Sequence, residues 1–160
     1  MSHNPYGKYV EGEDPVASLE TTSRRIEQTV RVWSPAAFAR SYAEGKWTGL
    51  ELLVHLAQCE MVFSNRLRFA LAQDDYVVQP FDQDPWMAAE AGADGPSALE
   101  AYVALRRMNL ALCRQLTPAQ HTRTVRHPER GQIDVNWVIE MFAGHERHHL
   151  PQIGAIESNA

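Results

Sequence analysis

Five consecutive residues near the end of the 160-residue chain, His145-Glu146-Arg147-His148-His149, carry the side chains best suited to chemistry. If the segment is helical, His145 and His149 lie one turn apart on one face, which is the spacing that two imidazoles need to bind one metal ion. The same residues satisfy the H-E-x-x-H pattern of zinc proteases, in which the glutamate is the general base. The pentapeptide therefore predicts either a metal site built from its outer histidines or a protease site that depends on Glu146.

A third ligand should distinguish these alternatives, because a catalytic metal usually takes three protein ligands. Proteases of this pattern take a further His or Glu downstream, and only Glu157 is available in the eleven residues after His149. His55 lies in a strongly apolar segment, where an imidazole needs a partner for its nitrogens. The simplest alternative for His55 is a core histidine that is hydrogen-bonded to a neighbour. We favour a three-histidine metal site of His55, His145 and His149.

The other polar residues of these segments have less distinctive patterns. His148 turns away from the apolar stripe by about 100° and is expected beside the site or on the surface. Cys59, one turn beyond His55, suits a small core residue as well as a fourth ligand or a nucleophile. Glu146 and Glu60 are expected to be solvated carboxylates. The remaining histidines lie in polar or loop segments and are expected to be solvent-exposed: His3, His121 and His127.

Four segments with helical apolar spacing must position these residues. They are 14–32, 48–73, 96–116 and a last one that runs from 135 past 149 and through Pro151, after Asp134 as N-cap. Thr48 and Glu51 have the spacing of a capping box at the start of the second segment, and Ser97 and Glu100 repeat it in the third. Residues 122–128 suit a loop or a brief extended piece.

The second and third helical segments are joined by residues 74–95, which make a connection longer than most. Such a connection tends to be functional or to contain a short helix of its own. We therefore expect an all-α four-helix bundle with one long crossover connection, formed by a single domain of residues 1–160.

Composition excludes several classes of protein. The net charge of -5 and the pI of about 5.8 argue against nucleic-acid binding, which depends on an excess of Lys and Arg. No apolar run is long enough to cross a membrane, and the first dozen residues do not have the pattern of a secretory signal. We expect a cytoplasmic protein with no nucleic-acid or membrane partner. Cys59 and Cys113 lie in helical segments and do not suggest a disulfide scaffold.

Several short motifs, taken in order, resemble the DinB/YfiT-like superfamily of four-helix-bundle metalloenzymes. The motifs are Lys46-Trp47-Thr48, Leu53-Val54-His55-Leu56-Ala57, Phe81-Asp82-Gln83-Asp84-Pro85-Trp86 and the segment from Gly144 to Ile153. The resemblance spans nearly the whole chain, and it maps the family's metal ligands onto His55, His145 and His149. It also implies that Asp84 and Trp86 lie near the mouth of the pocket as substrate contacts; the alternative is a turn aspartate and an aromatic lid over the core.

The superfamily includes thiol-dependent S-transferases and a mycothiol-dependent isomerase, so the resemblance implies an enzyme with a divalent metal and a small-molecule substrate. The metal would be zinc or nickel, with iron and manganese as alternatives. A low-molecular-weight thiol would attack the substrate, or water would do so in a hydrolase. A homodimer is also implied. The rival hypotheses are a non-catalytic bundle with a structural or sensing metal, and a metallopeptidase that uses Glu146.

Overall fold

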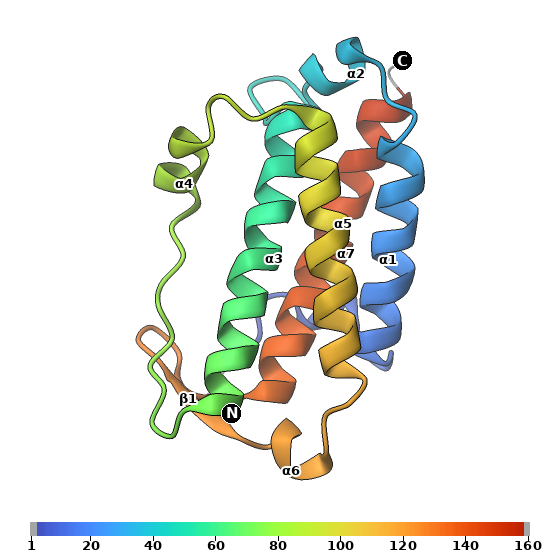
Figure 1. Ribbon diagram of the computed structural model, residues 1–160. Helices are drawn as coiled ribbons and strands as arrows, with labels where there is room; N and C mark the ends of the chain where they lie inside the picture. The colour runs from blue at the N-terminus through green and yellow to red at the C-terminus, as the bar shows by residue number, and fades with distance from the viewer. Residues whose placement is uncertain (1–2, 159–160) are drawn as a thin grey trace.

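The computed structural model describes residues 3–158, and its main feature is a bundle of four long helices (Figure 1). These helices are α1 (Pro15–Val30), α3 (Gly49–Ala72), α5 (Gly95–Cys113) and α7 (Val135–Ser158). Helix α3 packs against both α5 and α7, and α1 packs against α7 and α5. The predicted all-α four-helix bundle is confirmed, and α7 continues through Pro151 as expected.

The long connection between α3 and α5 determines the topology of the bundle. It leaves the lower end of α3 in Figure 1 and returns along the outside of the bundle to its upper end, so that α3 and α5 run in the same direction. A short helix, α4 (Gln83–Ala89), lies within the connection. The predicted long crossover is present, and of the two possibilities considered for it, the structure shows a short helix. Helix α7 runs in the opposite direction to α3 and contacts it along the bundle interior.

Capping residues set where the long helices begin. Before α3, the Thr48 backbone N–H donates to Glu51 Oε2 at 2.7 Å and the Glu51 N–H donates to Thr48 Oγ1 at 3.2 Å, which is the predicted capping box. The prediction for α5 was wrong, because Asp94 is its N-cap and accepts from the Ser97 N–H at 2.9 Å. Pro96 lacks an N–H and suits the first turn, so the helix begins earlier than Ser97.

Shorter elements complete the fold. A 3-10 helix, η1 (Gly7–Tyr9), precedes α1 and packs against α7, α2 (Pro35–Ala39) lies between α1 and α3, and α6 (Pro118–His121) follows α5. The strands β1 (Thr124–His127) and β2 (Gly131–Asp134) form an antiparallel hairpin in which residue 124 pairs with 134. Of the two forms considered for residues 122–128, the structure contains the extended one. Among the described residues, no helix is long and apolar enough to cross a membrane.

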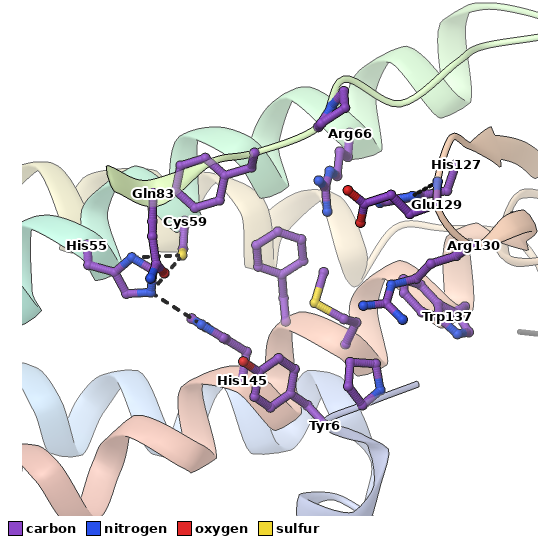
Figure 2. Close-up of a pocket in the computed structure, with 15 residues that line it drawn as sticks. Tyr6, His55, Cys59, Arg66, Gln83, His127, Glu129, Arg130, Trp137 and His145 are labelled. Atoms are coloured by element: carbon purple, nitrogen blue, oxygen red, sulfur yellow. Dashed lines mark hydrogen bonds between the residues drawn. The ribbon is translucent and has the colours of Figure 1, made fainter. Parts of the chain in front are cut away.

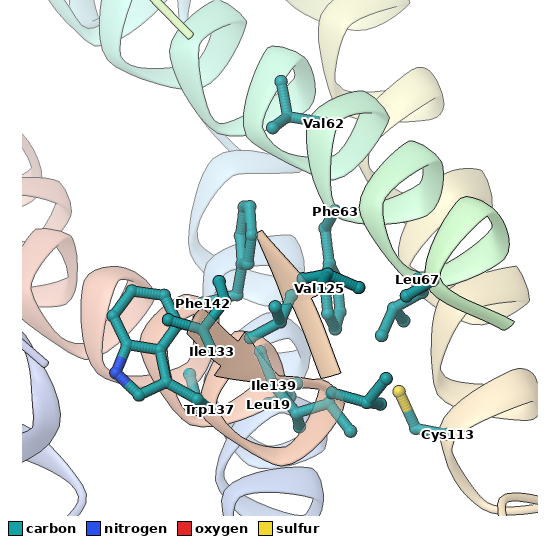
Figure 3. Packing of buried hydrophobic residues seen from close by; sticks show 14 of the residues in the cluster. Leu19, Val62, Phe63, Leu67, Cys113, Val125, Ile133, Trp137, Ile139 and Phe142 are labelled. Atoms are coloured by element: carbon teal, nitrogen blue, oxygen red, sulfur yellow. The ribbon is translucent and has the colours of Figure 1, made fainter. Parts of the chain in front are cut away.

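Aromatic packing sets how α3 and α7 face each other. The rings of Phe63 and Phe142 stack with centroids 4.6 Å apart, in a cluster that also contains Val125 and Ile133 from the hairpin (Figure 3). A second cluster around Leu52, Tyr102 and Ile153 fills the other half of the bundle. Because buried side chains are closely packed, this arrangement fixes the position of α7 along α3. On α7, His145 and His149 lie between the residues of the two clusters, and they face His55, which lies among residues of the second cluster on α3.

Candidate metal centre

Three imidazole rings from two helices converge in the bundle interior. Nε2 of His55, on α3, lies 3.3 Å from Nε2 of His145, on α7. Nε2 of His149 lies 3.1 Å from the same atom of His145. The rings of His55 and His149 have centroids 5.1 Å apart, and both residues are buried. The structure thus brings together the three residues that the sequence selected as candidate ligands.

The nitrogen spacing fits a bound divalent ion. Two metal–nitrogen bonds of about 2.0–2.1 Å at a tetrahedral angle place the two nitrogens about 3.3 Å apart. The observed separations of 3.3 Å and 3.1 Å between the Nε2 atoms agree with that value. Imidazole nitrogens are common ligands of zinc, copper, iron and nickel, so the chemistry of the donors also fits.

The protonation of these histidines favours metal binding. Burial lowers the pKa of His55 to about 3 and that of His149 to about 4, and it lowers the pKa of His145 well below its usual value. The rings therefore stay neutral near pH 7, and each retains a lone pair for a metal. Nδ1 of His149 donates to Oε1 of Gln152 at 2.6 Å, which leaves the lone pair on the Nε2 that faces His145.

Cys59 provides a second possible donor set. Its Sγ lies 3.5 Å from Nε2 of His55, and one ligand atom from each of His55, Cys59 and His145 all lie within 4.8 Å of one another. The two donor sets therefore share His55 and His145 and differ in the third ligand. Burial raises the pKa of the Cys59 thiol, so it stays protonated unless a metal displaces the proton.

A cavity of about 210 Å³ opens beside the imidazoles (Figure 2). His55, Cys59 and His145 contribute to its lining, whereas His149 does not. Its other walls come from the N-terminal segment, the connection before α4, the hairpin and the first turns of α7. A small molecule in this cavity would therefore meet the donor groups from one side.

The N-terminal segment covers one side of the cavity and was not selected from the sequence. The Tyr6 ring meets the His145 ring edge-on, with centroids 4.9 Å apart. The Tyr6 backbone is so close to α7 that a Cβ atom on Gly144 would lie 2.2 Å from the Tyr6 carbonyl oxygen. The lack of a side chain at Gly144 therefore allows Tyr6 to reach the site. A glycine directly before a candidate ligand was the only local signal of this contact.

Glu146 is not a solvated carboxylate, so that expectation was wrong. It is 2% exposed, and its Oε1 accepts hydrogen bonds from Tyr102 and, at 2.8 Å, from Arg106. Burial raises the pKa of Glu146 to about 7. Glu146 is not among the residues that line the cavity beside His55 and His145. In this arrangement it contacts other helices rather than the space where a substrate would bind.

Glu60 was also expected at the surface, and it is 1% exposed. Arg106 of α5 bridges the two carboxylates, with Nη2 at 2.5 Å from Glu60 and 2.8 Å from Glu146. Asn109 donates to Glu60 Oε2 at 3.0 Å. A charge buried inside a bundle needs such partners, so this network connects α3, α5 and α7. No local pattern in the sequence identifies Arg106 as the partner of the two carboxylates, because the contact joins different helices.

Two other histidines also have partners. His148 lies beside the site as expected, and its Nδ1 is 3.0 Å from the Tyr9 hydroxyl. His127 was expected to be solvent-exposed, which was wrong, since it is 6% exposed. Its Nδ1 accepts from the Glu129 N–H at 3.2 Å, and it lies in the cavity lining because the hairpin folds over that end of the bundle.

Asp84 and Trp86 lie on α4, and both are exposed. Neither lines the cavity beside the histidines. Asp84 lines a separate depression with Trp47 and Thr48, and the Trp86 ring meets the Phe81 ring edge-on at 5.1 Å. Phe81 does line the cavity, so Trp86 reaches it only through this contact.

The fold and the donor groups together define a four-helix bundle with a candidate metal centre between α3 and α7. A family model described as the DinB superfamily matches residues 18–153, and the chain belongs to that superfamily. This confirms the resemblance seen in the sequence motifs.

Two curated relatives show how far the similarity extends. The chain is 29% identical over 142 residues to an Oceanobacillus iheyensis protein named "Putative metal-dependent hydrolase OB0782", covering 88% of this chain and 83% of that protein. It is 26% identical over 138 residues to YfiT of Bacillus subtilis, which carries the same functional name, covering 84% and 78% of the two chains.

Two solved structures share the fold. The structure of Bacillus subtilis YfiT matches with a TM-score of 0.80 and 23% identity, over 99% of this chain and 89% of that one. A mycothiol-dependent maleylpyruvate isomerase matches with a TM-score of 0.70 and 14% identity, over 88% of this chain and 59% of that chain. At these identities the structural matches establish the fold.

Proposed function

We propose that this protein is a metal-dependent enzyme that hydrolyses a small molecule, with His55, His145 and His149 as the metal ligands. The observation that carries the proposal is the convergence of three neutral imidazoles beside a cavity, with Nε2 of His55 and Nε2 of His149 at 3.3 Å and 3.1 Å from Nε2 of His145. The names of the relatives from Oceanobacillus iheyensis and Bacillus subtilis support hydrolysis as the reaction.

A divalent ion in such a site acts as a Lewis acid and lowers the pKa of a bound water or thiol. The protein's own residues hold and orient the reactants. Gln152 keeps the Nε2 lone pair of His149 directed toward the other ligands. Burial raises the pKa of Tyr6, so its hydroxyl stays protonated and can donate a hydrogen bond to a substrate oxygen. Phe81 and Phe142 line the cavity and limit the access of bulk water.

Thiol transfer is the second candidate. It is favoured by the fold shared with a mycothiol-dependent isomerase, which uses a thiol as its name states. A low-molecular-weight thiol would then take the place of water as the nucleophile. Zinc and nickel are the metals that we propose first, because imidazole ligands suit both. The homodimer stays a prediction.

Two rivals have specific structural requirements. A peptidase mechanism needs Glu146 to contact a water at the metal, but its Oε1 is bonded to Tyr102 and Arg106 and it is outside the cavity lining. A structural or sensing site needs a fourth protein ligand that closes the coordination sphere, and Cys59 is the residue placed to provide it.

Metal analysis and a hydrolysis assay test the proposal together. The purified protein should hold about one zinc or nickel ion per chain and should hydrolyse 4-nitrophenyl acetate in a manner that a chelator abolishes and the metal restores. His145→Ala should lose both properties. The matched control is His121→Ala, on α6, which should retain both. If His145→Ala retains its metal, the site is elsewhere; if it loses metal but hydrolyses at the full rate, the metal has no part in hydrolysis.

A further inference from the structure

The cavity contains a buried cation, Arg66, that forms no close ion pair with any carboxylate of the described residues. Arg66 is 7% exposed, and among residues 3–158 it forms no ion pair within 4.0 Å. Its Nε has no hydrogen-bond partner in that part of the chain, and its Nη2 has only a 3.4 Å contact to the Gln79 carbonyl oxygen. The guanidinium carbon lies 5.8 Å from the centre of the Phe142 ring. A buried charge without a partner is costly, so it points to a ligand that supplies one.

Arg66 shares a face of α3 with His55, one of the candidate metal ligands. Eleven residues separate it from His55 along α3, which is about three turns and about 16 Å of helix axis. Helical side chains lean toward the N-terminus of their helix, so Arg66 leans toward His55. Both residues line the same cavity, at opposite ends, as Figure 2 shows.

The hairpin adds further hydrogen-bond donors at the Arg66 end. Arg130 lines the cavity with its guanidinium carbon 5.9 Å from the centre of the Trp137 ring, and it makes no ion pair within the described residues. His127 accepts from the Glu129 backbone through Nδ1, so in its neutral form its proton is on Nε2. Three side chains from two elements thus offer N–H groups at one end of the cavity.

One carboxylate of the described residues, Glu129, also belongs to the cavity lining. It is exposed and lies beyond ion-pair distance of both Arg66 and Arg130. With two guanidinium groups and one carboxylate, this end of the cavity has an excess of one positive charge. An excess of that size matches a singly charged carboxylate better than a doubly charged phosphate.

We propose that the substrate is a small organic acid derivative whose carboxylate binds Arg66, with Arg130 and His127 as further donors, while its reacting group lies at the histidines. The planar guanidinium fork matches the two oxygens of a carboxylate. This inference rests on the proposed function, because it assigns a substrate class to the cavity of the same site. Arg66 then determines specificity and does not take part in the reaction itself.

A pair of probes of equal shape measures this preference without the metal. Metal-stripped protein is titrated with hexanoate and with hexanamide, and binding is followed by NMR chemical shifts. Hydrogen bonds to charged groups contribute more than neutral ones, so hexanoate should bind at least about tenfold more tightly. Arg66→Met should abolish this difference. The matched control is Arg126→Met. Arg126 is an exposed arginine of the β1–β2 hairpin and lies outside the cavity lining, so this variant should retain the difference.

Two more variants separate recognition from a structural role. Glu129→Gln removes the competing carboxylate and should strengthen hexanoate binding several-fold, while hexanamide binding stays the same. Arg66→Met should keep or raise the melting temperature. Arg66 forms no ion pair among the described residues, so its removal does not leave a buried carboxylate unpaired. If Arg66→Met does not fold, Arg66→Lys is used instead. It keeps the charge but lacks the two parallel N–H donors of the guanidinium group, so a weaker preference for hexanoate is expected.

Equal binding of hexanoate and hexanamide to the unmutated protein would overturn the inference, as would a preference that survives in Arg66→Met or is unchanged in Arg66→Lys. Zinc titration of the unmutated protein and of Arg66→Met is run in parallel. Absence of zinc binding in the unmutated protein would count against the proposed function alone, because the carboxylate preference is measured without metal. Retained zinc binding in Arg66→Met with a lost preference supports the inference.

Discussion

His149 is held by Gln152, whose Oε1 accepts a hydrogen bond from Nδ1 of the ring at 2.6 Å. The two residues lie three apart on α7, so they are neighbours on one helix face. A metal-binding histidine is commonly oriented by such a partner, which fixes the ring and the nitrogen that carries the proton. This contact supports His149 as a ligand even though His149 does not line the cavity.

Replacing Gln152 with Ala should weaken zinc binding by about 10–100-fold, because partners of this kind usually contribute that much to metal affinity. Zinc titration calorimetry measures the effect. Gln115→Ala, an exposed glutamine after α5, is the matched control and should bind zinc like the unmutated protein. Equal affinity in the two variants would mean that Gln152 does not orient a ligand.

The third ligand is tested by comparing His149→Ala with Cys59→Ala. If the three histidines bind the metal, His149→Ala loses it and Cys59→Ala retains it. Cobalt substitution adds an independent measurement, since a thiolate ligand produces a sulfur-to-cobalt charge-transfer band that three imidazoles do not. A band that disappears in Cys59→Ala, together with retained metal in His149→Ala, would assign the site to His55, Cys59 and His145 instead.

Gly144→Ala should displace the N-terminal segment from α7. The added Cβ would lie 2.2 Å from the Tyr6 carbonyl oxygen, and relieving such an overlap typically costs about 1–3 kcal/mol of stability. Urea unfolding measures this loss of stability. The contact of the Tyr6 ring with the His145 ring should also be lost in the variant. Gly154→Ala, on the same helix, meets no atom within 4 Å and should be neutral or stabilising by up to about 1 kcal/mol. A similar loss in both variants would contradict the proposed overlap.

Arg106→Met should destabilise the protein by about 3–5 kcal/mol, because it leaves the carboxylates of Glu60 and Glu146 buried without their shared cation. Chemical denaturation measures the change. Arg107→Met is the control from the next position of α5, where the side chain is exposed and pairs loosely with Glu27 at 3.6 Å. An effect as small as that of Arg107→Met would show that the network contributes little to stability.

The metal-stripped protein should lose stability as the pH falls below about 6.5. The pKa values of His55 and His149 in the folded state are about 3 and about 4, so the unfolded chain takes up protons first. Each histidine then contributes a loss of up to about 1.4 kcal/mol per pH unit, which ends near its folded-state pKa. Thermal melts between pH 7.5 and about 5 follow this loss.

Glu146 acts in the opposite direction over part of that range, since its pKa is raised to about 7 and its protonated form stabilises the folded state as the pH falls. The comparison therefore uses His149→Gln, which keeps Glu146 and removes one imidazole. The pH dependence of stability should be less steep in that variant than in the unmutated protein. Equal slopes would mean that His149 is not buried in its neutral form.

Much of the fold could be predicted from local patterns. Apolar spacing identified the four long helices within a few residues, and Thr48 with Glu51 marked the start of α3. The candidate ligands could also be identified from the sequence, because His145 and His149 are four apart and His55 lies among apolar residues. The N-cap of α5 was misassigned because Asp94 and Ser97 are both good capping residues, and the amide that each accepts from depends on the backbone.

The pairing of polar groups between helices could not be predicted from local sequence patterns. Glu60 and Glu146 have the spacing of ordinary helix carboxylates, and only the placement of Arg106 from α5 makes them buried partners. His127 becomes buried only because the hairpin folds onto the bundle. Tyr6 reaches His145 through a contact between segments more than a hundred residues apart.

The sequence by itself determined which residues can share a helix face, because the 3.6-residue period acts over a few turns. That was sufficient to predict the helices, the placement of His145 and His149 on one face, and the apolar surroundings of His55. The tertiary structure decided which faces meet, and so it decided the cavity, the buried carboxylates and the burial of Arg66 without a close ion pair among the described residues. These depend on how the long crossover and the packing of α3 on α7 set the positions of the helices, which no local pattern specifies.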